Sequence, residues 1–207
     1  MKKLIIFDMD GTLVDSSLTI ANAINTVRKK LSLEPMDEDD ILSKVNDPNI
    51  NPALYFYESK AFTPEHEEWF TDYYHKHHQE ELRLYQGTKE LLVELKERGY
   101  KLAIATNAYR ISTLQSLEHL DILHYFDSIA CYDDVKKGKP HPFMLYKILD
   151  ELNISNQDSL FVGDGHRDEL ASKAANIDYL MVNWGFSDHK ENVIHTIAEL
   201  RERILEL

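Results

Sequence analysis

Short apolar runs recur along the chain, and each one ends in a polar cluster. Four of them are Leu4 to Phe7, Leu102 to Ala105, Ser128 to Cys131 and Leu160 to Val162, and a fifth, Tyr179 to Val182, follows closely. Continuous apolar runs of this length, without alternation, are typical of strands that are buried on both faces of a parallel sheet. We therefore expect these five segments to form the strands of one parallel sheet.

Helical patterns separate the apolar runs. We expect helices over about 109–120, 142–152, 166–175 and 190–206, and a further helix that has Thr88 as its N-cap and ends near Gly99. The last of these places a stripe of apolar residues on one face: Val193, Ile194, Ile197, Leu200 and Ile204. Strands that alternate with helices at this spacing predict an α/β fold, a doubly wound parallel sheet of the Rossmann-like type.

The interval between the first two predicted strands breaks this alternation. Residues 16–85 contain no strand-like run, whereas Ala21, Ile24, Val27 and Leu31 recur at helical spacing. An ordinary connection in such a sheet is a few residues plus one helix, so this segment is too long to be one. We predict that 16–85 is an inserted all-helical cap domain and that 1–15 and 86–207 form the α/β catalytic core.

Charge and composition narrow the classes of partner. The 207 residues carry a formal net charge of −13, which argues against a general duplex-binding surface, so we expect no nucleic-acid partner. A small anionic ligand is compatible with this charge, because a metal ion and a few backbone amides can reverse its sign locally. No apolar run approaches the ~18 residues of a membrane span. The single cysteine, Cys131, cannot form an internal disulfide, and we expect a cytoplasmic protein without a membrane partner. The oligomeric state stays open.

Polar clusters follow four of the predicted strands, where a doubly wound sheet binds its ligands. They are Asp8 to Asp15 after the first strand, Thr106-Asn107 after the second, Gly138 to Pro142 beyond the third, and Gly163 to Asp168 after the fourth. Together these clusters offer carboxylates, a hydroxyl and an ammonium group. Such a set can hold a divalent cation and a phosphoryl group side by side.

These four clusters, in this order, resemble the motifs of the haloacid dehalogenase-like hydrolases. The first of them reads Asp8-Met9-Asp10-Gly11-Thr12, and the resemblance spans nearly the whole chain. The long insert after the first motif is similar to the helical-cap branch of that family, which includes phosphoglycolate phosphatase and related small-molecule phosphatases. The resemblance implies a Mg²⁺-dependent phosphatase that hydrolyses a small-molecule phosphate monoester through an aspartyl-phosphate intermediate.

The resemblance also implies a catalytic set made of Asp8, Asp10, Thr106 and Lys139. Asp8 would be the nucleophile that attacks phosphorus. Asp10 would protonate the leaving group and then deprotonate the hydrolytic water. Thr106, Asn107 and Lys139 would bind the phosphoryl oxygens, and Lys139 would also neutralise charge on the nucleophile.

A Mg²⁺ site is implied by the same motifs. In the family, the ion takes side-chain oxygens from the positions of Asp8 and Asp164 and the backbone carbonyl from the position of Asp10. Asp168 would contribute either directly or through a water molecule. Gly11 allows the tight turn that follows Asp10.

Three other activities compete with a phosphatase. Dehalogenases and phosphonate hydrolases of the family do not keep an acid at the position of Asp10, so its presence favours phosphate esters. Phosphomutases of the beta-phosphoglucomutase type keep both aspartates and typically add a histidine five residues after Asp15, where this chain has Ile20. A phosphomutase and a non-catalytic binding module stay as alternatives.

Departures from the family pattern leave the substrate open. Gly165 follows Asp164, where the family usually has serine or threonine, and Gln86-Gly87 replaces the usual Pro-Gly pair. The segment from Lys44 to Asn49 lacks the glycine-centred loop expected of a phosphoglycolate enzyme. Sugar phosphates and nucleoside monophosphates are therefore open as substrates beside glycolate phosphate.

Overall fold

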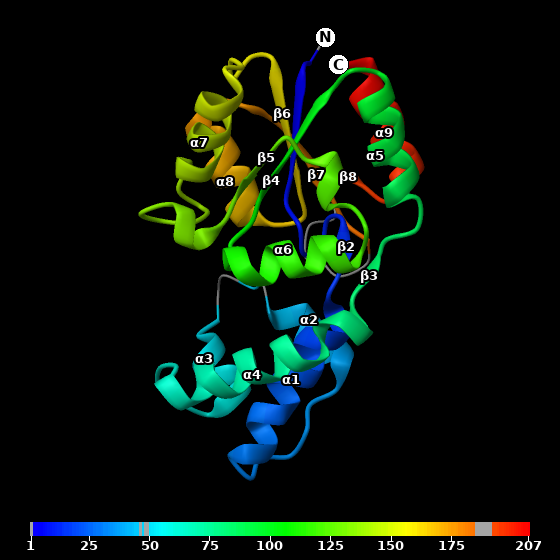
Figure 1. The fold of residues 1–207 in the computed structure, drawn as a ribbon. Coiled ribbons are helices and arrows are strands. Elements are labelled where there is room, and N and C mark those ends of the chain that lie inside the picture. Colours follow the sequence, from blue (N-terminus) through cyan, green and yellow to red (C-terminus); the bar gives the residue numbers. More distant parts are fainter. Residues whose placement is uncertain (1, 46, 48–49, 185–191) are drawn as a thin grey trace. The chain divides into compact units, whose positions relative to one another are not determined.

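The computed structural model describes residues 2–45, 47, 50–184 and 192–207, and internal contacts divide it into two compact units (Figure 1). In the described residues, the first unit comprises 2–15, 83–184 and 192–207. The second comprises 16–45, 47 and 50–82. Each unit has its own set of buried apolar side chains.

Six parallel strands form the sheet of the first unit. They are β1 (Leu4–Phe7), β4 (Lys101–Ala105), β5 (Ser128–Ala130), β6 (Ser159–Gly163), β7 (Asp178–Val182) and β8 (Val193–Ile194). Their order is β5-β4-β1-β6-β7-β8. The chain thus builds outward from β1 to one edge and then returns to build toward the other, which places the topological switch point at β1. The five strands predicted from the apolar runs are confirmed.

Helices cover both faces of this sheet. Those that pack against its strands are α5 (Thr88–Glu97), α7 (Phe143–Leu152), α8 (His166–Ala175) and α9 (Ile197–Glu206), while α6 (Arg110–His119) packs against the 3-10 turns that flank β5. Figure 1 shows α7 and α8 on one side of the sheet and α5 and α9 on the other. Short 3-10 turns, η1 (Leu123–Tyr125) and η2 (Tyr132–Asp134), flank β5. The predicted doubly wound fold is therefore confirmed, and all four side chains of β1 are fully buried within it.

Two helix starts differ from the sequence-based expectation. Val193 and Ile194 were expected in the last helix, but they form the edge strand β8 beside Met181 and Val182. The helix begins only after Thr196, whose hydroxyl accepts a hydrogen bond from Glu199 N at 3.1 Å and so caps its first turn. Thr88, in turn, is the first helical residue of α5 rather than its N-cap, which is Gly87.

A two-stranded ribbon stands where the first unit ends along the chain. β2 (Val14–Asp15) pairs in antiparallel fashion with β3 (Arg83–Leu84), and Tyr85 N donates to Leu13 O at 3.2 Å. These contacts place residues 83–85 with the first unit. The expected cap range of 16–85 thus extends three residues beyond the second unit, whose described residues end at Leu82.

The described residues of the second unit are helical wherever they have regular structure. Its helices are α1 (Ser17–Lys30), α2 (Glu38–Val45), α3 (Pro52–Tyr57) and α4 (Pro64–Glu81). Their apolar faces meet in one core, formed by Ala21, Ile24, Val27, Ile41, Phe56 and Tyr57. The segment 44–49, in which the sequence shows no glycine-centred loop, falls partly on residues 46, 48 and 49, which lie outside the described residues. No helix in the described part of the chain is long and apolar enough to cross a membrane.

Candidate active site

The register of the sheet gathers the polar clusters at one edge. Phe7, the last residue of β1, lies opposite Ile104 of β4 and Val162 of β6. Asp8 follows directly, and its backbone N donates to Val162 O at 2.9 Å, so it continues the line of the strand. Because the three strands are parallel, the residues that follow them, Asp8, Thr106 and Asp164, emerge at the same edge.

The turn after Asp8 packs against the fourth cluster. Gly11 has a φ of 78°, a conformation that glycine adopts without strain, and its N–H donates to Val14 O at 2.9 Å. A Cβ atom at Gly11 would lie 2.3 Å from Asp164 Oδ2. The backbone of the first motif therefore lies in direct contact with the carboxylate of Asp164, and only glycine fits this position.

Lys139 joins two of the carboxylates. Its Nζ lies 2.7 Å from Asp8 Oδ1 and 2.6 Å from Asp168 Oδ1, and its side chain is only 4% exposed. Nζ also lies 5.8 Å from the ring centroid of Phe161, which is fully buried in β6. Burial lowers the pKa of a lysine, but the carboxylates of Asp168 and Asp8 outweigh that effect and raise the pKa of Lys139. The ammonium group is therefore charged.

Asp168 also fixes the start of α8. Its Oδ2 accepts a hydrogen bond from Gly165 N at 3.1 Å, which closes the first turn of the helix around Gly165. A Cβ atom at Gly163 would lie 2.7 Å from this carboxylate. Asp168 is thus tied to the helix start through one oxygen and to Lys139 through the other.

Thr106 and Asn107 follow β4. Thr106 is buried, and its Oγ1 accepts a hydrogen bond from Ala108 N at 3.0 Å. The Asn107 side chain is engaged with the backbone of Lys139: Nδ2 donates to Lys139 O at 3.0 Å and Oδ1 accepts from Lys139 N at 2.8 Å. The loops that carry the second and third motifs are therefore joined.

The carboxylates fit a divalent cation. One oxygen atom from each of Asp8, Asp164 and Asp168 lies within 4.8 Å of the others. Burial is the largest cause that raises the pKa of Asp8, to about 7, and it also raises the pKa of Asp164 well above its ordinary value. In the described residues, Lys139 supplies one positive charge against these three carboxylates. Oxygen ligands with this excess of negative charge are what Mg²⁺ prefers.

Comparison with known proteins agrees with this geometry. The sequence profile of the family described as haloacid dehalogenase-like hydrolase matches residues 5–182, which include all four clusters. The chain belongs to the haloacid dehalogenase-like hydrolases. The profile stops at the end of β7, so β8 and α9 lie beyond the matched part of the chain.

Curated relatives and solved structures extend the likeness over most of the chain. A pyrophosphatase named PpaX from Bacillus mycoides is 33% identical over 184 residues, 87% of this chain and 83% of that protein. A predicted phosphoglycolate phosphatase from Haemophilus somnus has a TM-score of 0.84 at 26% identity and covers 98% of both chains. A predicted phosphatase from Clostridium acetobutylicum has a TM-score of 0.85 at 25% identity and covers 100% of both.

This haloacid dehalogenase-like hydrolase brings together most of the residues expected from its sequence. Asp8, Asp164, Asp168 and Lys139 meet in one cluster, with Thr106 and Asn107 at the neighbouring strand end. Asp10 lies close enough to Asp8 to raise the pKa of Asp8 further, but its carboxylate is outside the group of three that could hold a cation.

The sequence pattern did not single out two aromatic residues that lie at the site. Phe161 lies beneath the Lys139 ammonium, and the hydroxyl of Tyr179 donates to Gly165 O at 3.3 Å. Burial and the nearby carboxylates, that of Asp168 foremost, raise the pKa of Tyr179. Both residues belong to apolar strand runs, and their sequence context alone gives no reason to separate them from ordinary core residues.

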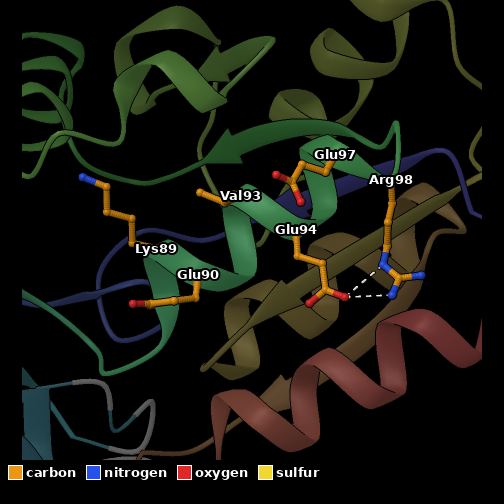
Figure 2. Close-up of a pocket in the computed structure, with 6 residues that line it drawn as sticks. All are labelled: Lys89, Glu90, Val93, Glu94, Glu97 and Arg98. Carbon is orange, nitrogen blue, oxygen red and sulfur yellow. Dashed lines mark hydrogen bonds and ion pairs between the residues drawn. The ribbon is translucent and has the colours of Figure 1, made fainter.

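A surface pocket of about 690 Å³ lies elsewhere in the first unit. It is lined by residues of α5 and the residue that follows it: Lys89, Glu90, Val93, Glu94, Glu97 and Arg98 (Figure 2). Glu94 turns toward Arg98 there, and their side chains are joined at 2.8 Å. None of the residues predicted to bind or react with a substrate lines this pocket.

Proposed function

We propose that the protein is a Mg²⁺-dependent phosphatase that hydrolyses a small-molecule phosphate compound through an aspartyl-phosphate formed on Asp8. The observation that carries this proposal is the position of the Lys139 ammonium, 2.7 Å from Asp8 and 2.6 Å from Asp168 at the carboxyl end of β1. A buried carboxylate beside a fixed cation is suited to attack a phosphoryl group, whose negative charge would otherwise repel it.

In the first step, a carboxylate oxygen of Asp8 attacks phosphorus. The new bond joins Asp8 to the phosphoryl group, and the bond between phosphorus and the leaving oxygen breaks. Asp10 gives its proton to that oxygen. Lys139 and Thr106 bind the phosphoryl oxygens, together with amide hydrogens of Asn107 that its bond to Lys139 leaves available.

In the second step, water attacks the phosphorus of the aspartyl-phosphate. Asp10, now deprotonated, takes a proton from that water as the oxygen–phosphorus bond forms. The bond between Asp8 and phosphorus breaks, which releases inorganic phosphate and restores the Asp8 carboxylate. Asp10 is protonated again and ready for the next substrate.

The metal would be held by the carboxylates of Asp8 and Asp164 and the backbone carbonyl of Asp10, with Asp168 beside it or joined through a water. When bound, Mg²⁺ would offset the charge shared by the phosphoryl oxygens and the carboxylates. Asp168 has one oxygen 2.6 Å from Lys139 Nζ and the other bonded to Gly165 N, which supports an indirect role.

Inorganic pyrophosphate is a second candidate substrate beside a phosphate monoester. The relatives named pyrophosphatase, 33% identical over 184 residues in the Bacillus mycoides protein, favour it. Both substrates require the same attack on phosphorus and differ only in the leaving group. The leaving group of pyrophosphate is phosphate, whereas that of a monoester is an alkoxide. Phosphate is the more stable anion, so its departure depends less on a proton from Asp10.

A phosphate-release screen tests the proposal. The full chain is assayed with Mg²⁺ and with EDTA against pyrophosphate, glycolate phosphate, sugar phosphates and nucleoside monophosphates. We expect release from one class of substrate that needs Mg²⁺. Asp8→Asn should abolish it, whereas Asp121→Asn, a matched change at an exposed surface aspartate, should leave it unchanged.

The outcomes separate the competing activities. Phosphate release that persists in Asp8→Asn would exclude Asp8 as the nucleophile. Transfer of phosphate to a second hydroxyl of the substrate, without release, would indicate a phosphomutase. Substrate binding without either reaction would indicate a binding module.

A further inference from the structure

The side chain of Asn107 makes a two-point contact with the backbone of Lys139. Nδ2 donates to Lys139 O at 3.0 Å, and Oδ1 accepts from Lys139 N at 2.8 Å. The amide of asparagine matches the donor and the acceptor of a single residue, so it holds that residue much as a neighbouring strand would. The two residues are 32 positions apart, so this contact joins the loop after β4 to the loop before α7.

The packing around this contact leaves little freedom. A Cβ atom at Gly138 would lie 2.4 Å from Asn107 Oδ1 and 2.8 Å from Tyr132 Cδ2. Tyr132 N donates in turn to Ala108 O at 3.1 Å, one residue beyond Asn107. The absence of a side chain at Gly138 is therefore what allows the Asn107 amide to reach Lys139.

We propose that Asn107 is a positioning residue that acts through Lys139: its side chain fixes the backbone from which the Lys139 ammonium reaches Asp8 and Asp168. Only the kinetic part of this inference rests on the proposed phosphatase function. The part that concerns the placement of Lys139 stands on the contacts alone.

The physical reason is the length of the lysine side chain. A lysine side chain has four rotatable bonds, and fixing them costs conformational entropy. Two ion pairs, at 2.7 and 2.6 Å, hold the end of the Lys139 chain. Asn107 holds its beginning, so the end can meet both carboxylates only while residue 139 keeps its place. A small displacement of the backbone would separate the ammonium from one carboxylate or from both.

The test compares Asn107→Ala with Asn156→Ala in the full chain. Asn156 is a matched control, because its side chain also bonds to backbone, donating to Ala175 O at 3.3 Å and accepting from Gln157 N at 3.1 Å. Asn156 lies just before β6, at the opposite end of that strand from Asp164. Asn107→Asp is a second variant, which keeps the acceptor for Lys139 N and loses the donor for Lys139 O.

The first readout is chemical and needs no turnover. Reductive methylation with formaldehyde and a borane modifies lysines according to their exposure, and peptide mass spectrometry gives the rate at each position. Lys139 is buried, whereas its neighbours Lys136 and Lys137 are exposed and serve as internal references. We expect Lys139 to react several-fold faster in Asn107→Ala than in Asn156→Ala, with Asn107→Asp between them and the two references unchanged.

The second readout is kinetic. A misplaced ammonium should lower kcat about 10- to 100-fold, since a shift of about 1 Å in a catalytic group has effects of that size. KM should change less than kcat if the ammonium matters most in the transition state. Asn156→Ala should keep both values.

The results distinguish the possible failures. If Lys139 in Asn107→Ala stays as protected from methylation as in Asn156→Ala, the positioning role is wrong. A fall in kcat without a loss of protection would mean that Asn107 acts on the substrate directly. If the wild-type chain releases no phosphate from any substrate, the proposed function fails. The methylation rates still decide the role of Asn107 in that case.

Discussion

At the scale of single residues, the site is a balance of charge around Lys139. Asp8, Asp164 and Asp168 each place an oxygen within 4.8 Å of the others, and Lys139 pairs with two of them. Burial raises the pKa values of Asp8 and Asp164, and repulsion between the crowded carboxylates raises them further. Substitutions here should therefore affect chemistry far more than their size suggests.

Gly11 gives a prediction with a matched control. Gly11 and Gly99 have φ values of 78° and 85°, so an alanine at either position costs about 1–2 kcal/mol of backbone strain. A Cβ atom at Gly11 also lies 2.3 Å from Asp164 Oδ2, whereas nothing lies within 4 Å of one at Gly99. We expect Gly11→Ala to abolish phosphate release and Gly99→Ala to keep it. Equal activities in the two variants would show that the contact with Asp164 can relax.

Asp10→Asn tests the acid and base. Loss of the proton donor should slow formation of the aspartyl-phosphate, and loss of the base should slow its hydrolysis, each about 10²- to 10⁴-fold. If hydrolysis of the aspartyl-phosphate is slowed more than its formation, phosphorylated Asp8 accumulates, and mass spectrometry of the intact protein detects it. A variant with the wild-type rate and pH profile would remove Asp10 from both steps.

At the scale of elements, parallel strand pairing decides which residues meet. β1 has β4 and β6 as neighbours in the same direction, so the residues after these three strands emerge together. Helices on the two faces keep the strands buried. Two of these helices, α5 and α9, are joined by Arg201, which donates to the two oxygens of Glu94 at 2.5 and 2.7 Å.

Glu94 predicts a change of stability with pH. Hydrogen bonds from Arg201, and then from Arg98, lower its pKa from the ordinary 4.5 to about 2. Figure 2 shows the contact with Arg98. Between these values the unfolded chain binds more protons than the folded one. The contribution of Glu94 is therefore complete above pH 4.5 and is lost as the pH falls toward 2. We expect Glu94→Gln to lower the urea midpoint at pH 6 and to lower it less at pH 3.

Glu97→Gln is the control for this experiment. Glu97 lines the same pocket on the same helix, and the described residues show no ion pair for it. Its replacement should leave the urea midpoint nearly unchanged at both pH values. A pH-independent effect of Glu94→Gln would mean that packing, rather than charge, links α5 to α9.

At the scale of the whole molecule, metal binding should be visible in stability. Mg²⁺ that binds only the folded protein stabilises it by about 2.7 kcal/mol at a concentration one hundred times Kd. We expect Mg²⁺ to raise the Tm of the wild type and of Asp121→Asn, and EDTA to reverse this. Asp164→Asn should lose the increase. Without metal, Asp164→Asn should be as stable as the wild type or more so, because it removes one of three crowded carboxylates.

A Tm that rises equally with Mg²⁺ in wild type and Asp164→Asn would contradict the proposed metal site. The comparison needs no substrate and no turnover. It therefore tests the metal site separately from the phosphatase reaction.

The sequence by itself determined five strands of the sheet and the candidate chemistry. Strands such as Leu4 to Phe7 are buried on both faces of the sheet, so their continuous apolar composition indicates where they lie in the fold. The polar residues that follow these runs could be assigned to one site, because a doubly wound sheet binds ligands beyond the carboxyl ends of its strands. The motifs then indicated a family, which the match over residues 5–182 shows.

Tertiary structure decided what local patterns leave open. Val193 and Ile194 fit a helical stripe in the sequence, yet they extend the sheet because Met181 and Val182 offer an open edge. The hydrogen bonds between Asn107 and Lys139 span 32 residues, and no periodicity encodes them. Local patterns record burial and helix formation, which act over a few residues. Hydrogen bonds and strand pairings between residues far apart in the sequence depend on contacts that form only when the sheet assembles.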